Sequence, residues 1–475
     1  MDLTLVGHES IYQVEQLQQA LFGVDAPGAA TSTVRQEDDS LIFHTQITIN
    51  GKTTEGLRTL PLADNTVKAF HKCLRQSYYD AAAPHLAEPP AWGALAGVRP
   101  TKISTRHLLA GGTEQSADRL LKEEYYVTAP RRKLALSCSK ASLQAVQSSQ
   151  KQDISLYIGI PFCPTRCSYC SFVSRTAGKK TALLDEYLDT LLREIAVTGE
   201  LLKNSGRTVR TLYIGGGTPT TLSAPQLAKL LQAVQQYIDL SRCIEYTVEA
   251  GRPDTLTEEK LQIIYSFGVH RISINPQTME NTVLAACKRP HSAEDVCHVY
   301  EIARQTGFAD INMDLIAGLP QDTVEGFCAS LDKLIEMSPA NITVHTLALK
   351  KGADLFENRQ ALPSREDVAQ MLRYAEKRLT EAGFSPYYLY RQKYMSGNYE
   401  NIGWSRDNRH CLYNIYMMEE LHPIVSLGGG GMSKINLPDG KLERFHNPKF
   451  PEQYVSQFEQ VLAQKREMFD LLKSL

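Results

Sequence analysis

The sequence contains no long hydrophobic run and no segment with the features of an export signal. No stretch of about 18 apolar residues occurs, and the opening residues MDLTLVGHES lack a basic start followed by an apolar run. We therefore expect a cytoplasmic protein without membrane insertion.

The sequence has no large excess of positive or of negative charge. Fifty-one basic and fifty-three acidic residues give a formal net charge of −2, so the chain has no overall field that would hold a polyanion, and nucleic acid is not an expected partner. A G-x-x-x-x-G-K-[ST] phosphate loop is absent, and no G-x-G-x-x-G follows a predicted strand. Ten cysteines in 475 residues are too sparse for a disulfide scaffold, and in a reducing compartment their thiols are free to bind metal.

The length and the pattern along the chain predict three parts. A chain of 475 residues exceeds the size at which a single hydrophobic core keeps growing. Asn50-Gly51, a hairpin-turn signal, ends a strand-like segment over 41–50 and indicates α/β structure near the N-terminus. The expected parts are an N-terminal α/β domain of unknown role over 1–150, a main domain over 151–355, and a C-terminal appended region over 356–475 with helices at 364–381 and near 452–474.

Short apolar runs separated by amphipathic segments fill the main domain and indicate repeated βα units. Parallel strands joined by helices form either a closed barrel or an open doubly wound sheet, and periodicity leaves both architectures open. In both, the chemistry lies at the carboxyl ends of the strands. The predicted strands are 155–160, 211–214, 245–249, 271–274, 311–316 and 341–345.

Three cysteines with the spacing CxxxCxxC follow the first of these strands: Cys163, Cys167 and Cys170. Thiolates select Fe–S clusters, zinc or copper(I), and no nearby Cys or His follows to complete a zinc site, since the next is Cys243. Four thiolates normally complete a [4Fe–4S] cluster, so three leave one iron open. The amino and carboxylate groups of S-adenosylmethionine (SAM) can chelate that iron, and one electron from the cluster then cleaves SAM to a radical that abstracts hydrogen.

Two segments carry a resemblance to a known family. Tyr157-Ile-Gly-Ile-Pro-Phe-Cys163 with the cysteine motif, followed by Gly215-Gly-Gly-Thr-Pro219, resembles the oxygen-independent coproporphyrinogen III oxidase family of radical SAM enzymes over about residues 154–350. Segments 97–103 and 391–403 are similar to its HemZ-like, or coproporphyrinogen dehydrogenase, branch. The resemblance implies an α/β fold with an incomplete (β/α)6 barrel, a [4Fe–4S] cluster, SAM, and a low-potential electron donor such as flavodoxin or ferredoxin.

The resemblance also implies a SAM site. Glycines let the backbone approach a ligand closely, carboxylates accept hydrogen bonds from an amine or ribose, and an arginine pairs with a carboxylate. Arg289 fits the family pattern although Lys288 stands where the family has glycine. The implied SAM-binding residues are Tyr157, Gly216, Gly217, Thr218, Glu249, Gln277, Arg289, Asp314 and Ala348, and no catalytic residue is implied beyond the cluster.

The implied activity is oxidative decarboxylation of coproporphyrinogen III to protoporphyrinogen IX, a step of haem biosynthesis. A haem chaperone on the same scaffold and a radical SAM enzyme acting on haem remain alternatives, because Gly159 and Phe172 replace a His and a Cys of the well-characterised decarboxylases. A tetrapyrrole needs cations and aromatic walls, and the C-terminal region contains both, although such a stretch also suits nucleic acid or ordinary surface and core. The residues concerned are Tyr387, Tyr388, Tyr390, Arg391, Lys393, Tyr394, Arg406, Arg409 and Tyr413.

Overall fold

The structure, a computed structural model, describes residues 1–23, 26–172, 174–179, 181–350, 352–358, 361–392 and 399–475. The chain forms two compact units, Met1–Lys140 and Ala141–Leu475. The division falls inside the helix α5 (Ala129–Gln147). Within these described ranges, no helix combines the length and the apolar composition that a membrane span requires.

In the described residues of the first unit, four strands form a sheet in the order β1-β2-β3-β4. The predicted hairpin is confirmed: Ile49 pairs with Lys52 across Asn50 and Gly51, whose φ values of 49° and 77° are the left-handed values that this two-residue turn requires. The elements are β1 (Asp2–Val6), α1 (Ile11–Phe22), β2 (Ala29–Glu37), β3 (Ser40–Ile49), β4 (Lys52–Pro61), α2 (Val67–Ala82), α3 (Thr101–Leu109) and α4 (Glu114–Tyr125).

The second unit is built on one large, mostly parallel sheet. Its strands are β5 (Asp153–Ile160), β8 (Thr208–Gly216), β9 (Glu245–Glu249), β10 (Arg271–Ser273), β11 (Asp310–Ala317), β12 (Asn341–Thr346), β13 (Ser385–Tyr390), β14 (Asn401–Ser405), β15 (Ile424–Leu427), β16 (Met432–Asn436) and β17 (Leu442–His446). Among the described residues, the order across the sheet is β13-β14-β12-β11-β10-β9-β8-β5-β15-β16-β17.

Six of these strands confirm the sequence prediction. β5, β8, β9, β11 and β12 cover the predicted segments, β10 ends one residue before its predicted end, and all six pair in parallel in chain order. Their residues are largely buried, and the β-branched and aromatic residues Ile, Val, Thr and Tyr recur in them.

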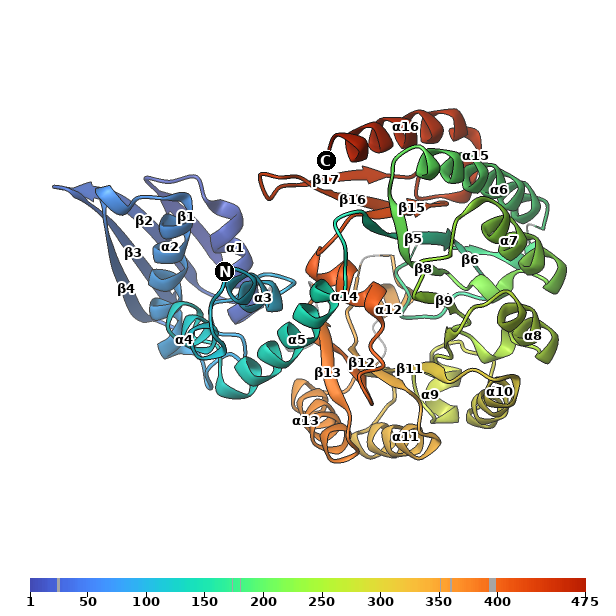
Figure 1. Cartoon of the computed structure of the whole chain (residues 1–475). Helices are drawn as coiled ribbons and strands as arrows, with labels where there is room; N and C mark the ends of the chain where they lie inside the picture. The colour runs from blue at the N-terminus through green and yellow to red at the C-terminus, as the bar shows by residue number, and fades with distance from the viewer. Residues whose placement is uncertain (24–25, 173, 180, 351, 359–360, 393–398) are drawn as a thin grey trace. The chain divides into compact units, whose positions relative to one another are not determined.

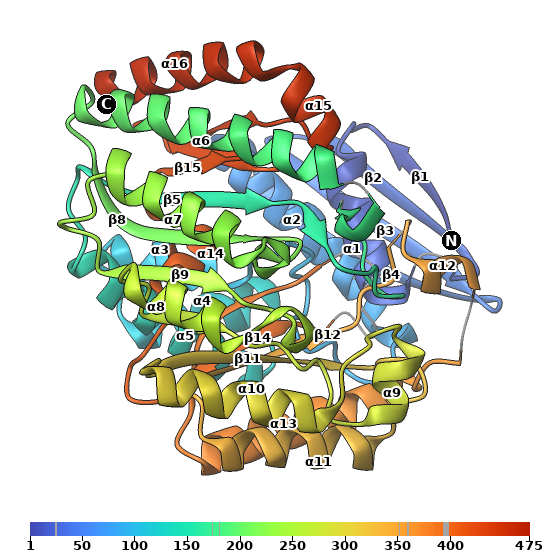
Figure 2. The same cartoon turned by 90° about the vertical axis from the view of Figure 1, so that its right-hand side faces the viewer.

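Helices cover the outer side of this curved sheet (Figure 1). Serines 223, 292 and 364 cap α7, α10 and α13 with reciprocal capping boxes, which fix where these helices begin. The helices are α6 (Thr181–Lys203), α7 (Ala224–Tyr237), α8 (Glu258–Ser266), α9 (Asn281–Ala286), α10 (Ala293–Thr306), α11 (Val324–Met337), α12 (Asp354–Asn358), α13 (Arg365–Glu381), α14 (Leu412–Glu419), α15 (Pro451–Ser456) and α16 (Phe458–Ser474). The turned view shows α6, α7, α8, α10, α11 and α13 along the same side (Figure 2).

Residues after 355 extend the large sheet at both edges. β14 pairs antiparallel with β12, and β15 pairs in parallel with β5, placing Val425 opposite Leu156. The predicted helix over 364–381 is confirmed as α13, whereas the helix predicted near 452–474 is interrupted at Gln457.

A buried ion pair joins α6 to α16 at the edge of the sheet to which β15 belongs. Lys465 Nζ lies 2.9 Å from Glu194 Oε1, and both side chains are almost completely buried. Glu194 Oε2 also accepts hydrogen bonds from the Tyr454 hydroxyl at 2.6 Å and the Gly428 amide at 2.8 Å. The glycine loop after β15 is therefore tied to both helices.

Lys465→Met should leave the Glu194 carboxylate buried without its cation. We expect the free energy of unfolding to fall by about 3–5 kcal/mol, the usual loss when one partner of a buried pair is removed, measured by urea unfolding. Lys441→Met is the control, because that lysine side chain is 79% exposed, and it should change stability by no more than about 0.5 kcal/mol. Equal losses in the two variants would contradict the prediction.

Candidate functional site

The cysteine motif lies on the loop that leaves β5. The short strand β6 (Phe162–Cys163) pairs in parallel with β7 (Arg175–Thr176), which holds the two ends of the loop together. Within it the Cys170 amide donates to the Cys167 carbonyl at 3.1 Å, a tight turn. Cys163, Cys167 and Cys170 line one cavity of about 390 Å³.

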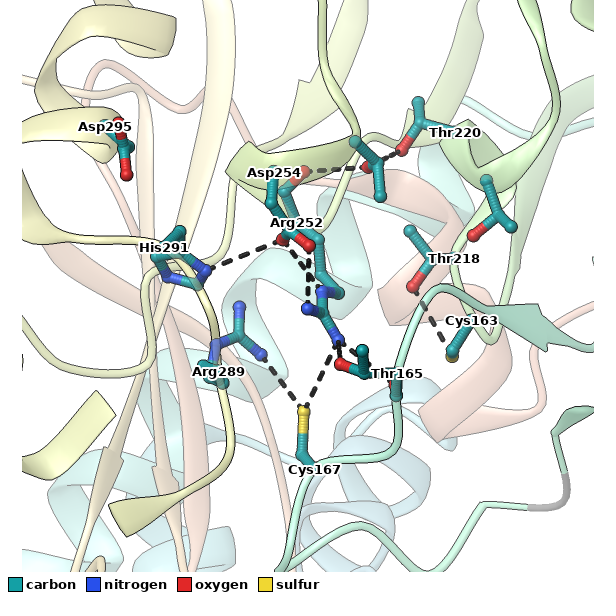
Figure 3. Close-up of polar contacts among 12 residues, drawn as sticks. Cys163, Thr165, Cys167, Thr218, Thr220, Arg252, Asp254, Arg289, His291 and Asp295 are labelled. Carbon is teal, nitrogen blue, oxygen red and sulfur yellow. Dashed lines mark hydrogen bonds and ion pairs between the residues drawn. The ribbon is translucent and has the colours of Figure 1, made fainter. Parts of the chain in front are cut away.

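The glycine loop after β8 packs directly against the cysteine loop. Gly217 needs to be glycine, because a Cβ there would lie 2.6 Å from the Phe162 carbonyl oxygen and 3.0 Å from Cys163 Sγ. Thr218 donates its amide to the Phe162 carbonyl at 2.7 Å and its hydroxyl to Cys163 Sγ at 3.5 Å (Figure 3). The two loops therefore form one wall of the cavity.

Glu249 ends β9 and lies against this glycine loop. Its carboxylate accepts hydrogen bonds from the Tyr213 hydroxyl at 2.5 Å and the Gly216 amide at 3.1 Å. Burial, with a smaller effect of the neighbouring Asp314, outweighs these bonds and raises the pKa of Glu249 to about 7. The side chain can thus accept or donate a hydrogen bond near neutral pH.

Asp314 and Gln277 also line the cavity. The Gln277 amide donates to the Asp314 carbonyl at 2.9 Å, and Gln277 has a left-handed φ of 72°, unusual for a residue other than glycine. The Asp314 carboxylate accepts from Asn312 Nδ2 at 2.7 Å and lies 3.5 Å from His345 Nε2. Gln277 Oε1 is buried without a hydrogen-bond partner among the described residues.

Arg289 reaches the cavity from the segment after α9. Its Nη2 donates to the Asn275 carbonyl at 2.7 Å, and Nη1 donates to the Tyr169 hydroxyl at 3.0 Å and to Cys167 Sγ at 3.7 Å. Its buried Nε has no partner among the described residues. The guanidinium is thus fixed beside the middle cysteine with a donor still available.

Most residues predicted from the sequence line this one cavity. Tyr157 does not: it is stacked against Tyr213 and Tyr413, with ring centroids 6.2 and 6.1 Å away. The predicted residues that line the cavity are Cys163, Cys167, Cys170, Gly216, Gly217, Thr218, Glu249, Gln277, Arg289, Asp314 and Ala348.

The aromatic and basic residues of the C-terminal region are divided. Tyr388 and Tyr390 line the cavity, whereas Arg406 and Arg409 lie at the other end of the strands, where Arg409 pairs with Asp310 at the start of β11. Tyr387 stacks on His410 away from the cavity. Lys393 and Tyr394 fall outside the described residues.

Several residues of the cavity wall were not predicted from the sequence. Asn312 precedes Asp314 by two positions, and this period of two was a usable signal, because alternate residues of a strand point to the same face. The missed lining residues include Arg252, Ser273, Asn275, Asn312, Thr343, His345 and Asn414.

The cavity fits a thiolate-bound cluster with a polar ligand beside it. Burial raises the pKa of Cys163 and raises the pKa of Cys170 to about 11, so binding iron there would release protons at neutral pH. Unpaired polar atoms of Gln277 and Arg289 point to a missing ligand. In the described part of the chain, no three His, Cys, Asp or Glu side chains are arranged to hold a single metal ion.

Comparison with known proteins identifies the family. The model of the radical SAM superfamily matches residues 157–334. The oxygen-independent coproporphyrinogen-III oxidase-like protein HemZ of Bacillus subtilis is 39% identical over 82% of this chain and 79% of its own length. The chain belongs to the radical SAM, oxygen-independent coproporphyrinogen III oxidase-like family. Membership implies a [4Fe–4S] cluster and SAM.

Two further relatives agree with this family. The haem chaperone HemW of Haemophilus influenzae is 30% identical over 64% of this chain and 76% of its own length. The structure of coproporphyrinogen III oxidase HemN of Escherichia coli, described as a radical SAM enzyme, is 26% identical, with a TM-score of 0.55, over 68% of this chain and 73% of that chain. The mixed α/β fold with its large parallel-rich sheet is thus the fold of that enzyme.

The raised pKa of Glu249 predicts a pH-dependent stability. Its pKa of about 7 in the folded chain exceeds the ordinary 4.5, so the folded state binds the extra proton. For the cofactor-free protein, the contribution is fully present below about pH 4.5 and is lost as pH rises through about 7, by about 3 kcal/mol.

Glu249→Gln should abolish this part of the pH dependence and stabilise the protein most at pH 8, as measured by urea unfolding from pH 5 to pH 8. Glu467→Gln, at an exposed position on α16, is the matched control and should keep the slope of the parent. A Glu249→Gln variant with the parent's slope would show that Glu249 is ionised throughout.

Proposed function

We propose that this protein is a radical SAM oxidoreductase that decarboxylates coproporphyrinogen III to protoporphyrinogen IX without oxygen. The observation that carries the proposal is the single cavity that joins the three cysteines to the polar ends of the parallel strands and to a tyrosine wall. The similarity to HemZ extends over 82% of the chain. In this proposal the six βα units form an incomplete (β/α)6 barrel, and the region over 356–475 contributes the substrate cover through the residues that line the cavity, Tyr388 and Tyr390 among them.

Three thiolates would hold a [4Fe–4S] cluster and leave one iron for SAM. When both are bound, the cluster and SAM supply reductive cleavage of SAM and abstraction of a hydrogen atom from the substrate. Glu249 and Asp314 would accept hydrogen bonds from the amine or ribose of SAM, and Arg289 would bind its carboxylate. A low-potential donor such as flavodoxin or ferredoxin would supply the electron.

The substrate would occupy the aromatic side of the cavity. Tyr213, Tyr388 and Tyr390 line it, and the rings of Tyr388 and Tyr390 are stacked with centroids 6.4 Å apart. Arg166 and Lys350 also line the cavity and would pair with the propionates of the macrocycle. Aromatic walls with a few cations suit a carboxylated tetrapyrrole.

A haem chaperone is the second candidate, favoured by Phe172. This phenylalanine follows the last cysteine by two residues, lines the cavity and is 71% exposed. Proteins named as the haem chaperone HemW are among the similar proteins. An exposed aromatic ring beside the cysteine loop would give haem a surface on which to stack.

The two candidates are separated by supplying the anaerobically reconstituted protein with SAM, a low-potential reductant and either coproporphyrinogen III or haem. We expect protoporphyrinogen IX and 5′-deoxyadenosine to form together in the first reaction. Stoichiometric haem binding without turnover of coproporphyrinogen III would favour the chaperone instead. Modified haem would point to an enzyme acting on haem itself.

Cys167→Ala should abolish both the brown chromophore and SAM cleavage, because two thiolates cannot hold the cluster. Iron content, the visible spectrum and 5′-deoxyadenosine yield measure this result. Cys297→Ala, which replaces a cysteine on α10 outside the cavity, should retain all three. Survival of SAM cleavage in Cys167→Ala would refute the assignment of the site.

A further inference from the structure

Two arginines point a guanidinium nitrogen at Cys167 Sγ. Arg289 belongs to the SAM site that the family resemblance implies, whereas Arg252 has no role in it. Arg252 lies just after β9 and is 4% exposed. A charged side chain buried so deeply is retained only where other groups satisfy it, so its contacts indicate what it does.

One edge of the Arg252 guanidinium holds the cysteine loop. Nη1 donates to the Thr165 carbonyl at 3.1 Å and to the Thr165 hydroxyl at 2.8 Å. The same nitrogen points at Cys167 Sγ from 4.0 Å, the outer limit of an N–H···S contact (Figure 3). Arg252 therefore contacts the loop between the first two cysteines and the sulfur of the second.

The other edge is locked by a carboxylate. Nε and Nη2 donate to the two oxygens of Asp254 at 2.9 and 2.8 Å, the two-point geometry that suits arginine and not lysine. His291 Nδ1 lies 3.6 Å from Asp254 Oδ1. Burial alone would raise the pKa of Asp254, but His291 and Arg252 outweigh it and hold that pKa well below its ordinary value. Asp254 is therefore a carboxylate that keeps Arg252 in one orientation.

A donor at a cluster sulfur changes the reduction potential of the cluster. One electron from a low-potential donor makes the cluster one charge more negative, and no bond has to form or break. Positive charge and N–H donors near a ligand sulfur stabilise that added charge and so raise the potential. The effect is large in a buried site, where water screens the charge little.

We propose that Arg252 is a positioning residue for the cluster: it fixes the loop that carries Cys167 and makes the bound cluster easier to reduce. The inference rests on the proposed cluster at Cys163, Cys167 and Cys170, but it does not depend on which tetrapyrrole is the substrate. Asp254 serves the same role indirectly by orienting the guanidinium.

The test is a redox titration of the full-length Arg252→Gln protein, reconstituted anaerobically and followed by electron paramagnetic resonance without SAM. We expect the equilibrium constant of cluster reduction to fall about tenfold, which for one electron is a shift of about 59 mV to more negative potential. Lys288→Gln is the matched control, since it removes an equal charge next to Arg289 from a side chain that is 56% exposed and pairs with Asp354. Its midpoint should stay at the parent value.

Arg252→Lys keeps the charge but loses the two-point contact with Asp254. Its midpoint potential should therefore lie between those of the parent and Arg252→Gln. If the cluster in Arg252→Gln has the same midpoint potential as the parent, the inference is wrong, but the proposed function is unaffected. Loss of the cluster from both Arg252 variants, with unfolding of the cluster-free chain unchanged, would overturn the effect on potential and show that Arg252 only holds the loop. A parent protein that binds no cluster would overturn the proposed function as well.

Discussion

The parallel pairing of β5 with β8 sets the geometry of the whole site. Gly159 lies opposite Gly215 and Ile160 opposite Gly216, so the cysteine loop and the glycine loop leave the sheet at the same level. The Gly217 amide then donates to the Ile160 carbonyl at 2.8 Å, continuing the contact beyond the strands. The remaining strands add their carboxyl ends to the same edge, so one backbone register brings distant residues together.

The parallel strands were predictable because their burial leaves a plain signal. Strands covered on both faces favour β-branched and aromatic residues, and Ile, Val, Thr and Tyr recur in β5, β9 and β12. The cavity residues follow from a positional rule, since residues just past such strands gather at one edge of the sheet. Glu249 and Asp314 lie there although 65 positions separate them along the chain, as 314 − 249 shows.

The parts of the fold and site that were not predicted depend on which strands become neighbours, and residue patterns do not contain that information. β15 pairs with β5 across more than half of the second unit, and no local periodicity marks it as a partner. For the same reason the sequence made Arg406 and Arg409 candidate cations for the substrate, although they lie at the opposite end of the strands from the cavity. Arg252 follows a strand, as the rule requires, but its two-sided contact with Asp254 and Thr165 exists only in three dimensions.

The buried pair of Glu194 and Lys465 has a consequence for the order of assembly. Glu194 belongs to the first helix after the cysteine loop, but its cation comes from α16 and its other donors come from Tyr454 and Gly428. In a nascent chain that ends before residue 465, this carboxylate lacks its cation. β5 also lacks its neighbour β15 until residue 427 has been added. The strand that presents the cysteines is thus completed by residues translated some 260 positions later, as 427 − 163 gives 264, so iron and sulfide delivered during translation would meet an unfinished pocket.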